Sequence, residues 1–164
     1  MQVGDGRLGQ LTYCTNIHPG ESWPEVSASL AQNLPAIRTE LAADQSFGIG
    51  LRLSAEAAAG LSEPAALADF QRFLADGDYY VFTINGFPYG AFHGRRVKED
   101  VYRPDWSEPP RLAYTNRLAD LLVELLPDGR PGSISTVPGT FKPWAAGRED
   151  AIADRKSTRL NSSH

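Results

Sequence analysis

Four short apolar segments, each followed by a polar loop, alternate with amphipathic helical segments along this chain of 164 residues. The apolar segments are rich in β-branched and aromatic residues, which suit the packed surface of a sheet. They are Leu11–Asn16, Phe47–Leu53, Tyr79–Asn85 and Ser133–Val137. Strands that alternate with helices predict a parallel sheet with helical crossover connections. A polar loop after every strand favours a barrel over an open sheet with one crevice.

Local signals mark where the helices between these strands begin and bend. Ser22 and Glu25 have the spacing of a capping box, and apolar residues then recur every three or four positions. Pro35 should kink or split this first helix, because proline lacks an amide donor. Ser54 is expected to cap a short helix, and Pro64 suits the first turn of the helix that follows.

Composition restricts the partners that this chain could have. The formal net charge is −4, and no basic stripe is visible, which argues against a nucleic-acid partner. No apolar run approaches 18 residues and no charged-then-apolar leader is present, which argues against a membrane span or a signal peptide. Cys14 is the single cysteine, so neither an intrachain disulfide nor a thiolate zinc site is expected. These features predict a cytoplasmic protein.

Candidate functional residues follow the strands, at the end of the sheet where ligands bind in parallel α/β folds. His18 follows the first strand and His93 the third, and either could act as an acid, a base or a metal ligand. The alternative for each is an imidazole bonded to a loop carbonyl. Asn16 and Asn85 could bind the hydroxyls of a sugar or polyol, or simply serve as turn residues.

Charged and aromatic side chains add further candidates for substrate binding. Arg52 lies in an apolar strand, where an unpaired charge would be costly, so it either meets an anion at the barrel mouth, which we favour, or pairs with a core carboxylate. Lys142 is a weaker candidate for an anion contact. Cys14 is expected to be a small buried hydrophobe rather than a nucleophile. Several aromatic residues could wall a sugar site, although core packing suits most of them: Tyr13, Phe87, Tyr89, Phe92, Trp106 and Trp144.

Five stretches between about Gly9 and Trp144 together resemble one family. They read LTYCTNIHPGESW, FGIGLRLS, YVFTINGFPYGAFHG, VYRPDW and GSISTVPGTFKPW. On these motifs the chain resembles the EboE family of metabolite traffic proteins, which look like sugar-phosphate isomerases and epimerases with a xylose isomerase-like TIM barrel. The family is associated with moving or processing the precursors of secondary metabolites.

The resemblance implies an α/β fold made of the first four β-strands, with their helices, of a (β/α)8 TIM barrel. This half-barrel would occupy residues 1–153, because a complete barrel needs about 250 residues. Residues 154–164 are expected to be a disordered, artefactual tail, since KSTRLNSSH shows no apolar period and resembles read-through from a sequencing adapter.

The same resemblance implies a protein that acts on, or carries, a small polar metabolite. The enzymatic version is isomerisation or epimerisation beside a carbonyl, assisted by a divalent metal ion whose ligands come mostly from later strands. The rival is a metabolite carrier that does no chemistry. Half a barrel should have little activity alone, and its two open sheet edges could promote self-association. An unrelated nucleotide-binding sheet is disfavoured, because no phosphate loop joins a strand to a helix.

Overall fold

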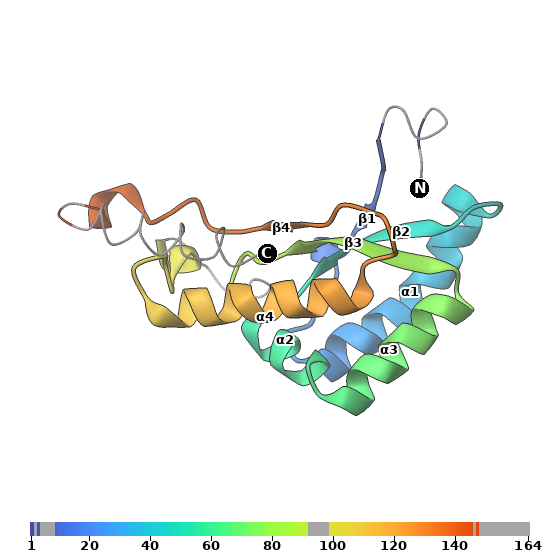
Figure 1. Cartoon of the computed structure of the whole chain (residues 1–164), viewed down its shortest axis with the longest axis horizontal. Coiled ribbons are helices and arrows are strands. Elements are labelled where there is room, and N and C mark those ends of the chain that lie inside the picture. Colours follow the sequence, from blue (N-terminus) through green and yellow to red (C-terminus); the bar gives the residue numbers. More distant parts are fainter. Residues whose placement is uncertain (2, 4–8, 92–98, 146, 148–164) are drawn as a thin grey trace.

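The computed structural model describes residues 1, 3, 9–91, 99–145 and 147 (Figure 1). Four parallel strands form one sheet in the order β1-β2-β3-β4, so each strand pairs with its neighbours in the sequence. This arrangement is α/β and is compatible with half of an α/β barrel. The strands are β1 (Tyr13–Cys14), β2 (Phe47–Arg52), β3 (Tyr79–Asn85) and β4 (Ser133–Ser135).

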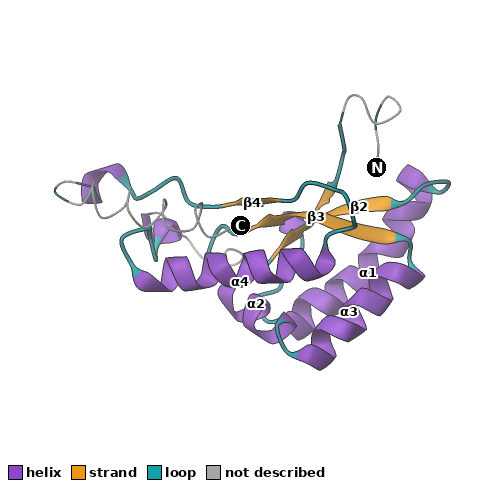
Figure 2. Ribbon diagram, in the orientation of Figure 1, coloured by secondary structure: helices purple, strands orange, loops and turns teal. Residues whose placement is uncertain are grey.

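All four α-helices lie on the same side of the sheet (Figures 1 and 2). The other side, which we call the open face, carries none of the α-helices in the described part of the chain. Short 3-10 segments η1, η2 and η3 span Thr15–Ile17, Glu99–Tyr102 and Lys142–Trp144. The α-helices are α1 (Trp23–Ala42), α2 (Ala55–Leu61), α3 (Pro64–Asp76) and α4 (Pro109–Leu125).

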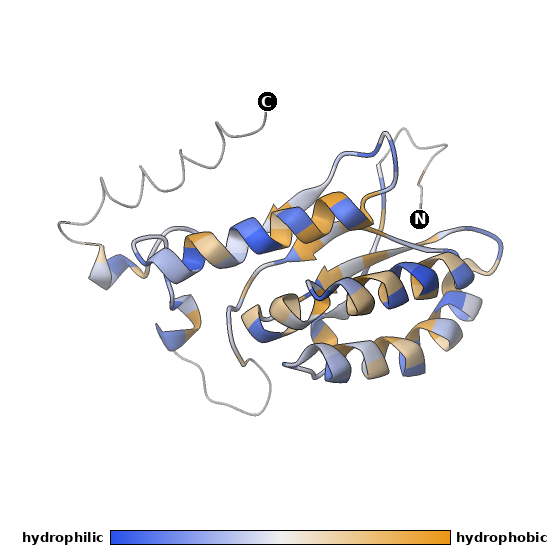
Figure 3. Cartoon of the chain, turned by 60° about the horizontal axis from the view of Figure 1, so that its bottom comes forward, coloured by the Kyte–Doolittle hydropathy of each residue, from blue (hydrophilic) through white to orange (hydrophobic). Residues whose placement is uncertain are grey.

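The hydrophobic core fills the space between the helices and the sheet. Colouring by hydropathy shows hydrophobic strands and helices whose colours alternate along their length (Figure 3). Ile49, Leu51 and Ile84 from the strands pack with Leu34 of α1 and Leu118 of α4, and none of these side chains is exposed. Each such side chain contributes about 1.5–3 kcal/mol through its removal from water. Among the described helices, none combines the length and hydropathy needed to cross a bilayer.

Two local expectations differ from the structure at the start of the chain. The first strand is only two residues long, because the chain turns into η1 at Thr15. Pro35 does not split α1, which is continuous over twenty residues. Pro35 and Ala31, whose carbonyl loses its amide partner, are both exposed, so water can satisfy that carbonyl. The burial of Leu30 and Leu34 then holds the helix together.

Two glycines in β2 allow other segments to cross the open face closely. A Cβ atom at Gly48 would lie 2.9 Å from the carbonyl oxygen of Leu11, and one at Gly50 would lie 3.2 Å from the side chain of Thr12. Gly48 therefore permits close approach of the Leu11 backbone, and Gly50 permits close approach of the Thr12 side chain. The caps at Ser22 and Ser54 are also present, with Glu25 accepting from the Ser22 amide at 3.0 Å.

Candidate functional site

Four uncharged polar side chains meet on the open face at the carboxyl ends of the strands. We call them the polar cluster: Cys14, Asn16, Asn85 and Ser135. Asn85 Nδ2 donates to Asn16 Oδ1 at 2.8 Å and to the Cys14 sulfur at 3.2 Å. The Ser135 hydroxyl donates to Asn85 Oδ1 at 2.8 Å, and the Cys14 thiol donates to Asn16 Oδ1 at 3.1 Å. Asn85 therefore joins the ends of β1, β3 and β4.

The cluster spans β2, which lies between β1 and β3 in the sheet. Cys14 pairs with Gly50 across the β1–β2 register, and Arg52 pairs with Asn85 across β2–β3. A Cβ at Gly50 would lie 3.2 Å from the side chain of Thr12 and 3.4 Å from that of Thr83, so this glycine leaves room for side chains on either side of β2. Cys14 and Ser135 are exposed and the two asparagines are partly exposed, so a ligand can reach them. Amide, hydroxyl and thiol groups of this kind can bind hydroxyl and carbonyl oxygens.

The structure corrects the expectation that Cys14 is a buried hydrophobe. Its side chain is exposed and takes part in two hydrogen bonds of the polar cluster. The physical reason is its position in the last residue of an edge strand, where the alternation of side chains turns it toward the open face. Tyr13, one residue earlier, faces the helices instead, with its ring 6.1 Å from that of the core residue Phe47.

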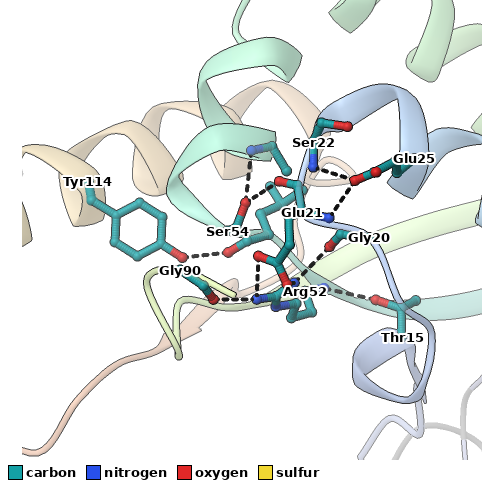
Figure 4. Close-up of polar contacts among 11 residues, drawn as sticks. Thr15, Gly20, Glu21, Ser22, Glu25, Arg52, Ser54, Gly90 and Tyr114 are labelled. Carbon is teal, nitrogen blue, oxygen red and sulfur yellow. Dashed lines mark hydrogen bonds and ion pairs between the residues drawn. The ribbon is translucent and has the colours of Figure 1, made fainter. Parts of the chain in front are cut away.

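Arg52, at the carboxyl end of β2, binds the loops that follow β1 and β3 (Figure 4). Its Nη1 atom donates to the carbonyl oxygen of Gly20 at 2.9 Å and to Glu21 Oε1 at 3.2 Å. Its Nη2 atom donates to the carbonyl oxygen of Gly90 at 2.9 Å and to Glu21 Oε2 at 3.3 Å. The Arg52 side chain is only 4% exposed. Because Arg52 itself directly precedes the loop after β2, it ties together the loops that follow β1, β2 and β3.

Of the two interpretations of Arg52, pairing with a carboxylate describes its contacts. The partner, Glu21, is 28% exposed and is not a core residue. The Arg52 backbone amide also donates to the Thr15 hydroxyl at 2.9 Å, and the Ser54 hydroxyl bonds the Glu21 carbonyl. A substrate anion would have to displace Glu21 to use the same donors, and this role of Arg52 stays a prediction.

His18 lies apart from the polar cluster in the contacts of the described residues. Its Nε2 atom is 2.8 Å from the phenol oxygen of Tyr13, which belongs to the helix side of the sheet. Burial raises the pKa of the Tyr13 phenol. His18 also lines an open groove of about 630 Å³ beside α1, together with Glu25, Gln32 and Asn33. The imidazole of His18 is therefore not part of the polar cluster that contains Asn16 and Asn85, and its catalytic role stays a prediction.

Tyr89 packs in an aromatic and cationic group that the sequence did not reveal. Its ring meets that of Tyr114 edge to face, with 5.0 Å between centroids. The guanidinium of Arg111 lies 5.7 Å from the Tyr89 ring and 5.4 Å from the Tyr114 ring. Arg111 is fully buried and donates to the carbonyl oxygens of Pro104 at 2.7 Å and Gly86 at 3.0 Å. Burial lowers the pKa of Arg111.

The signals for these missed residues were weak in the sequence. An arginine in the first turn of a helix opposes the helix dipole, and this misplacement at Arg111 was the available hint. Ser133 and Ser135, two apart on a strand, must share a face, which could have suggested Ser135 as a partner of Asn85. Glu21 had no such signal, because its role depends on a contact with a residue 31 positions away.

The remaining candidates do not join either group. Lys142 is exposed in η3, and within the described residues no hydrogen bond or ion pair joins it to the polar cluster or to Arg52. His93 lies outside the residues that the structure describes. Over the described part of the chain, no three side chains of histidine, cysteine, aspartate or glutamate come together as a metal site would require.

Comparison with known proteins adds no assignment. No protein-family model, curated protein or solved structure matches this chain.

Proposed function

We propose that this chain forms the first half of a TIM barrel of the EboE type, and that its open face binds a small polar metabolite. Sequential parallel strands with all their helices on one side support the barrel. In such a barrel the open face becomes the interior, and its carboxyl end becomes the mouth. The polar cluster then lies at the mouth.

The observation that carries the proposal is the polar cluster itself. Amide, hydroxyl and thiol groups from β1, β3 and β4 converge there, with Asn16 and Asn85 only 2.8 Å apart. A parallel sheet normally has apolar side chains on both faces, so a polar, accessible end on one face needs an explanation. Binding of a hydroxyl- or carbonyl-bearing metabolite explains it, because such a ligand can exchange hydrogen bonds with each member of the cluster.

Two versions of this function differ in chemistry. An isomerase or epimerase would remove and return a proton at a carbon beside a carbonyl, whereas a carrier would bind the same molecule without proton exchange. The polar cluster supports binding in both versions. Within the described residues it holds no carboxylate or imidazole that could act as a base, and this favours the carrier for the half-barrel alone.

The divalent metal implied by the family resemblance does not fit the residues that the structure describes. Cys14 is the only member of the polar cluster of a type that commonly ligates divalent metals strongly, and one thiol does not make a site. No step of the proposed function therefore runs through a metal ion bound by this part of the chain.

A ligand screen with one variant and one control tests the proposal. The probes are unphosphorylated aldoses, ketoses and polyols, with and without Mg²⁺ or Mn²⁺, and binding is followed by saturation-transfer NMR and calorimetry. Asn85→Ala removes the side chain that joins the cluster and should weaken binding by about fivefold to tenfold, since a hydrogen bond to the ligand contributes roughly 1 kcal/mol. Gln71→Ala, on the exposed side of α3, should leave binding unchanged.

The same samples separate the two versions. Uptake of deuterium from D2O beside the carbonyl of a bound sugar would identify an isomerase or epimerase, whereas binding without uptake would identify a carrier. Absence of binding by every probe, or equal binding by the wild type and Asn85→Ala, would overturn the assignment of the polar cluster as the binding site.

A further inference from the structure

A small, partly enclosed cavity lies beside Arg52. Its volume is about 10 Å³. A cavity of roughly 10–15 Å³, measured in this way, holds one water molecule. Its polar walls come from the loop after β1, from α1 and from β2, and apolar residues complete it. The lining residues are Thr15, His18, Pro19, Gly20, Val26, Ser29, Leu30 and Arg52.

One N–H group of the Arg52 guanidinium has no hydrogen-bond acceptor. A guanidinium carries five N–H groups, one on Nε and two on each Nη atom. The two Nη atoms make four hydrogen bonds, two with Glu21 and one each with the carbonyls of Gly20 and Gly90. The Nε atom is buried and has no partner among the protein atoms. Leaving such a donor unsatisfied costs about 1–3 kcal/mol, more when the group is charged.

Other polar groups in the wall can complete the shell of a water molecule. The Thr15 hydroxyl is already used, since it accepts from the Arg52 amide at 2.9 Å and donates to the Gly50 carbonyl at 3.2 Å. His18 Nε2 is 2.8 Å from the Tyr13 phenol oxygen and the Ser29 oxygen accepts from Asn33 at 3.5 Å, so His18 Nδ1 and the hydroxyl proton of Ser29 are the groups left for a water. A water at this position thus has one donor and two further polar groups as partners. Buried waters usually make about three hydrogen bonds, so this number of partners is sufficient.

We propose that this cavity binds one structural water, which accepts the Nε–H of Arg52 and links it to His18 and Ser29. The water connects the candidate histidine to the arginine that holds three loops together. Its route to solvent is the groove of about 630 Å³ beside α1, which shares His18, Pro19, Gly20 and Ser29 with the cavity. This inference stands on the geometry around Arg52 and is independent of the proposed function.

The first test is a measurement on the wild-type chain. A crystal structure at high resolution should show one density peak within hydrogen-bond distance of Arg52 Nε. In solution, the Hε proton of Arg52 should give a cross-peak with water of the sign that marks a residence time longer than a nanosecond. A dry cavity, or an Nε atom bonded to a protein oxygen, overturns the proposal.

A matched pair of variants on α1 tests the assignment to this cavity. Ser29→Val fills the cavity and removes a polar partner, so the water peak and the Hε–water cross-peak should both disappear, and the imidazole nitrogen shifts of His18 should change. Ser27→Val makes the same substitution on the same helix, in a wall of a different hollow, and should preserve all three signals. Persistence of the cross-peak in a folded Ser29→Val variant would also overturn the proposal.

Discussion

Replacement of Arg52 by methionine removes the contacts that join the loops after β1, β2 and β3. Methionine keeps much of the apolar stem, so the change isolates the guanidinium. Four hydrogen bonds are lost, two to the carbonyls of Gly20 and Gly90 and two to Glu21. The two carbonyl groups are then left without a donor in a site that is almost completely shielded from solvent, since only 4% of the Arg52 side chain is exposed in the wild type.

The expected loss can be divided between these partners. Each carbonyl that loses a charged donor costs about 1–1.5 kcal/mol once some water enters, toward the lower end of the range for buried groups. Glu21 is 28% exposed and can be rehydrated, so its share is no more than about 0–1 kcal/mol. We therefore expect Arg52→Met to lower the free energy of unfolding by about 2–4 kcal/mol. In a domain of this size that corresponds to a fall of roughly 4–16 °C in Tm.

Urea denaturation followed by circular dichroism measures the loss directly. Arg72→Met is the matched control, because Arg72 pairs with Asp69 on the surface of α3 and the two side chains are 72% and 68% exposed. The control should cost less than about 0.5 kcal/mol. Glu21→Gln should cost about 1 kcal/mol or less, because it leaves both carbonyl contacts of Arg52 in place. A loss for Arg52→Met no larger than that of the control would refute the role assigned to this side chain.

Three further changes have outcomes fixed by local geometry. Gly60→Ala should lower Tm, because the new Cβ would lie 2.8 Å from the Cβ of Trp23. This clash should outweigh the preference of about 1 kcal/mol that alanine has over glycine in a helix. Gly90→Ala is the control in the same thermal melts, because open space surrounds Gly90. The hydrogen bond from the Ser22 amide lowers the pKa of Glu25 in the folded chain. The wild type should therefore be more stable than Glu25→Gln at a pH above the unfolded pKa, near 4.5, and this advantage should vanish as the pH falls through the folded pKa. Denaturation at a series of pH values measures the difference. Tyr114→Phe should cost about 1–2 kcal/mol in urea, because the Leu53 carbonyl loses a bond of 2.5 Å. Burial also raises the pKa of Tyr114, so its protonated form stabilises the fold below pH 10 and this contribution is lost above it, which an alkaline absorbance titration would follow.

Sequence patterns predicted the fold because each element carries its own local signal. The α3 helix begins at Pro64 and ends before Gly77, as proline at the first turn and glycine after the last turn indicate. The second and third strands were predicted within one residue of β2 and β3. The order of the strands in the sheet follows from the rule that consecutive β/α units lie side by side.

The site was predicted only in part, because its contacts join residues far apart in the sequence. Asn16 and Asn85 were both proposed as hydroxyl-binding residues, and the structure brings them within 2.8 Å. Their partners Cys14 and Ser135 were not proposed. Whether a side chain near a strand end faces the helices or the open face depends on the register, and η1 interrupts that alternation directly after Cys14.

Two groups of side chains consequently have different roles at this end of the sheet. Arg52 and Arg111 are buried and donate to the carbonyl oxygens of the loops, which fixes those loops in place. On the open face, the polar cluster has no charge and remains accessible. A buried guanidinium is destabilised when it loses an acceptor, so these arginines restrict how far the loops can move. The rigid loops in turn hold Asn16 and Asn85 in register, and this restriction is what would make the cluster a preorganised binding site rather than a group of surface side chains.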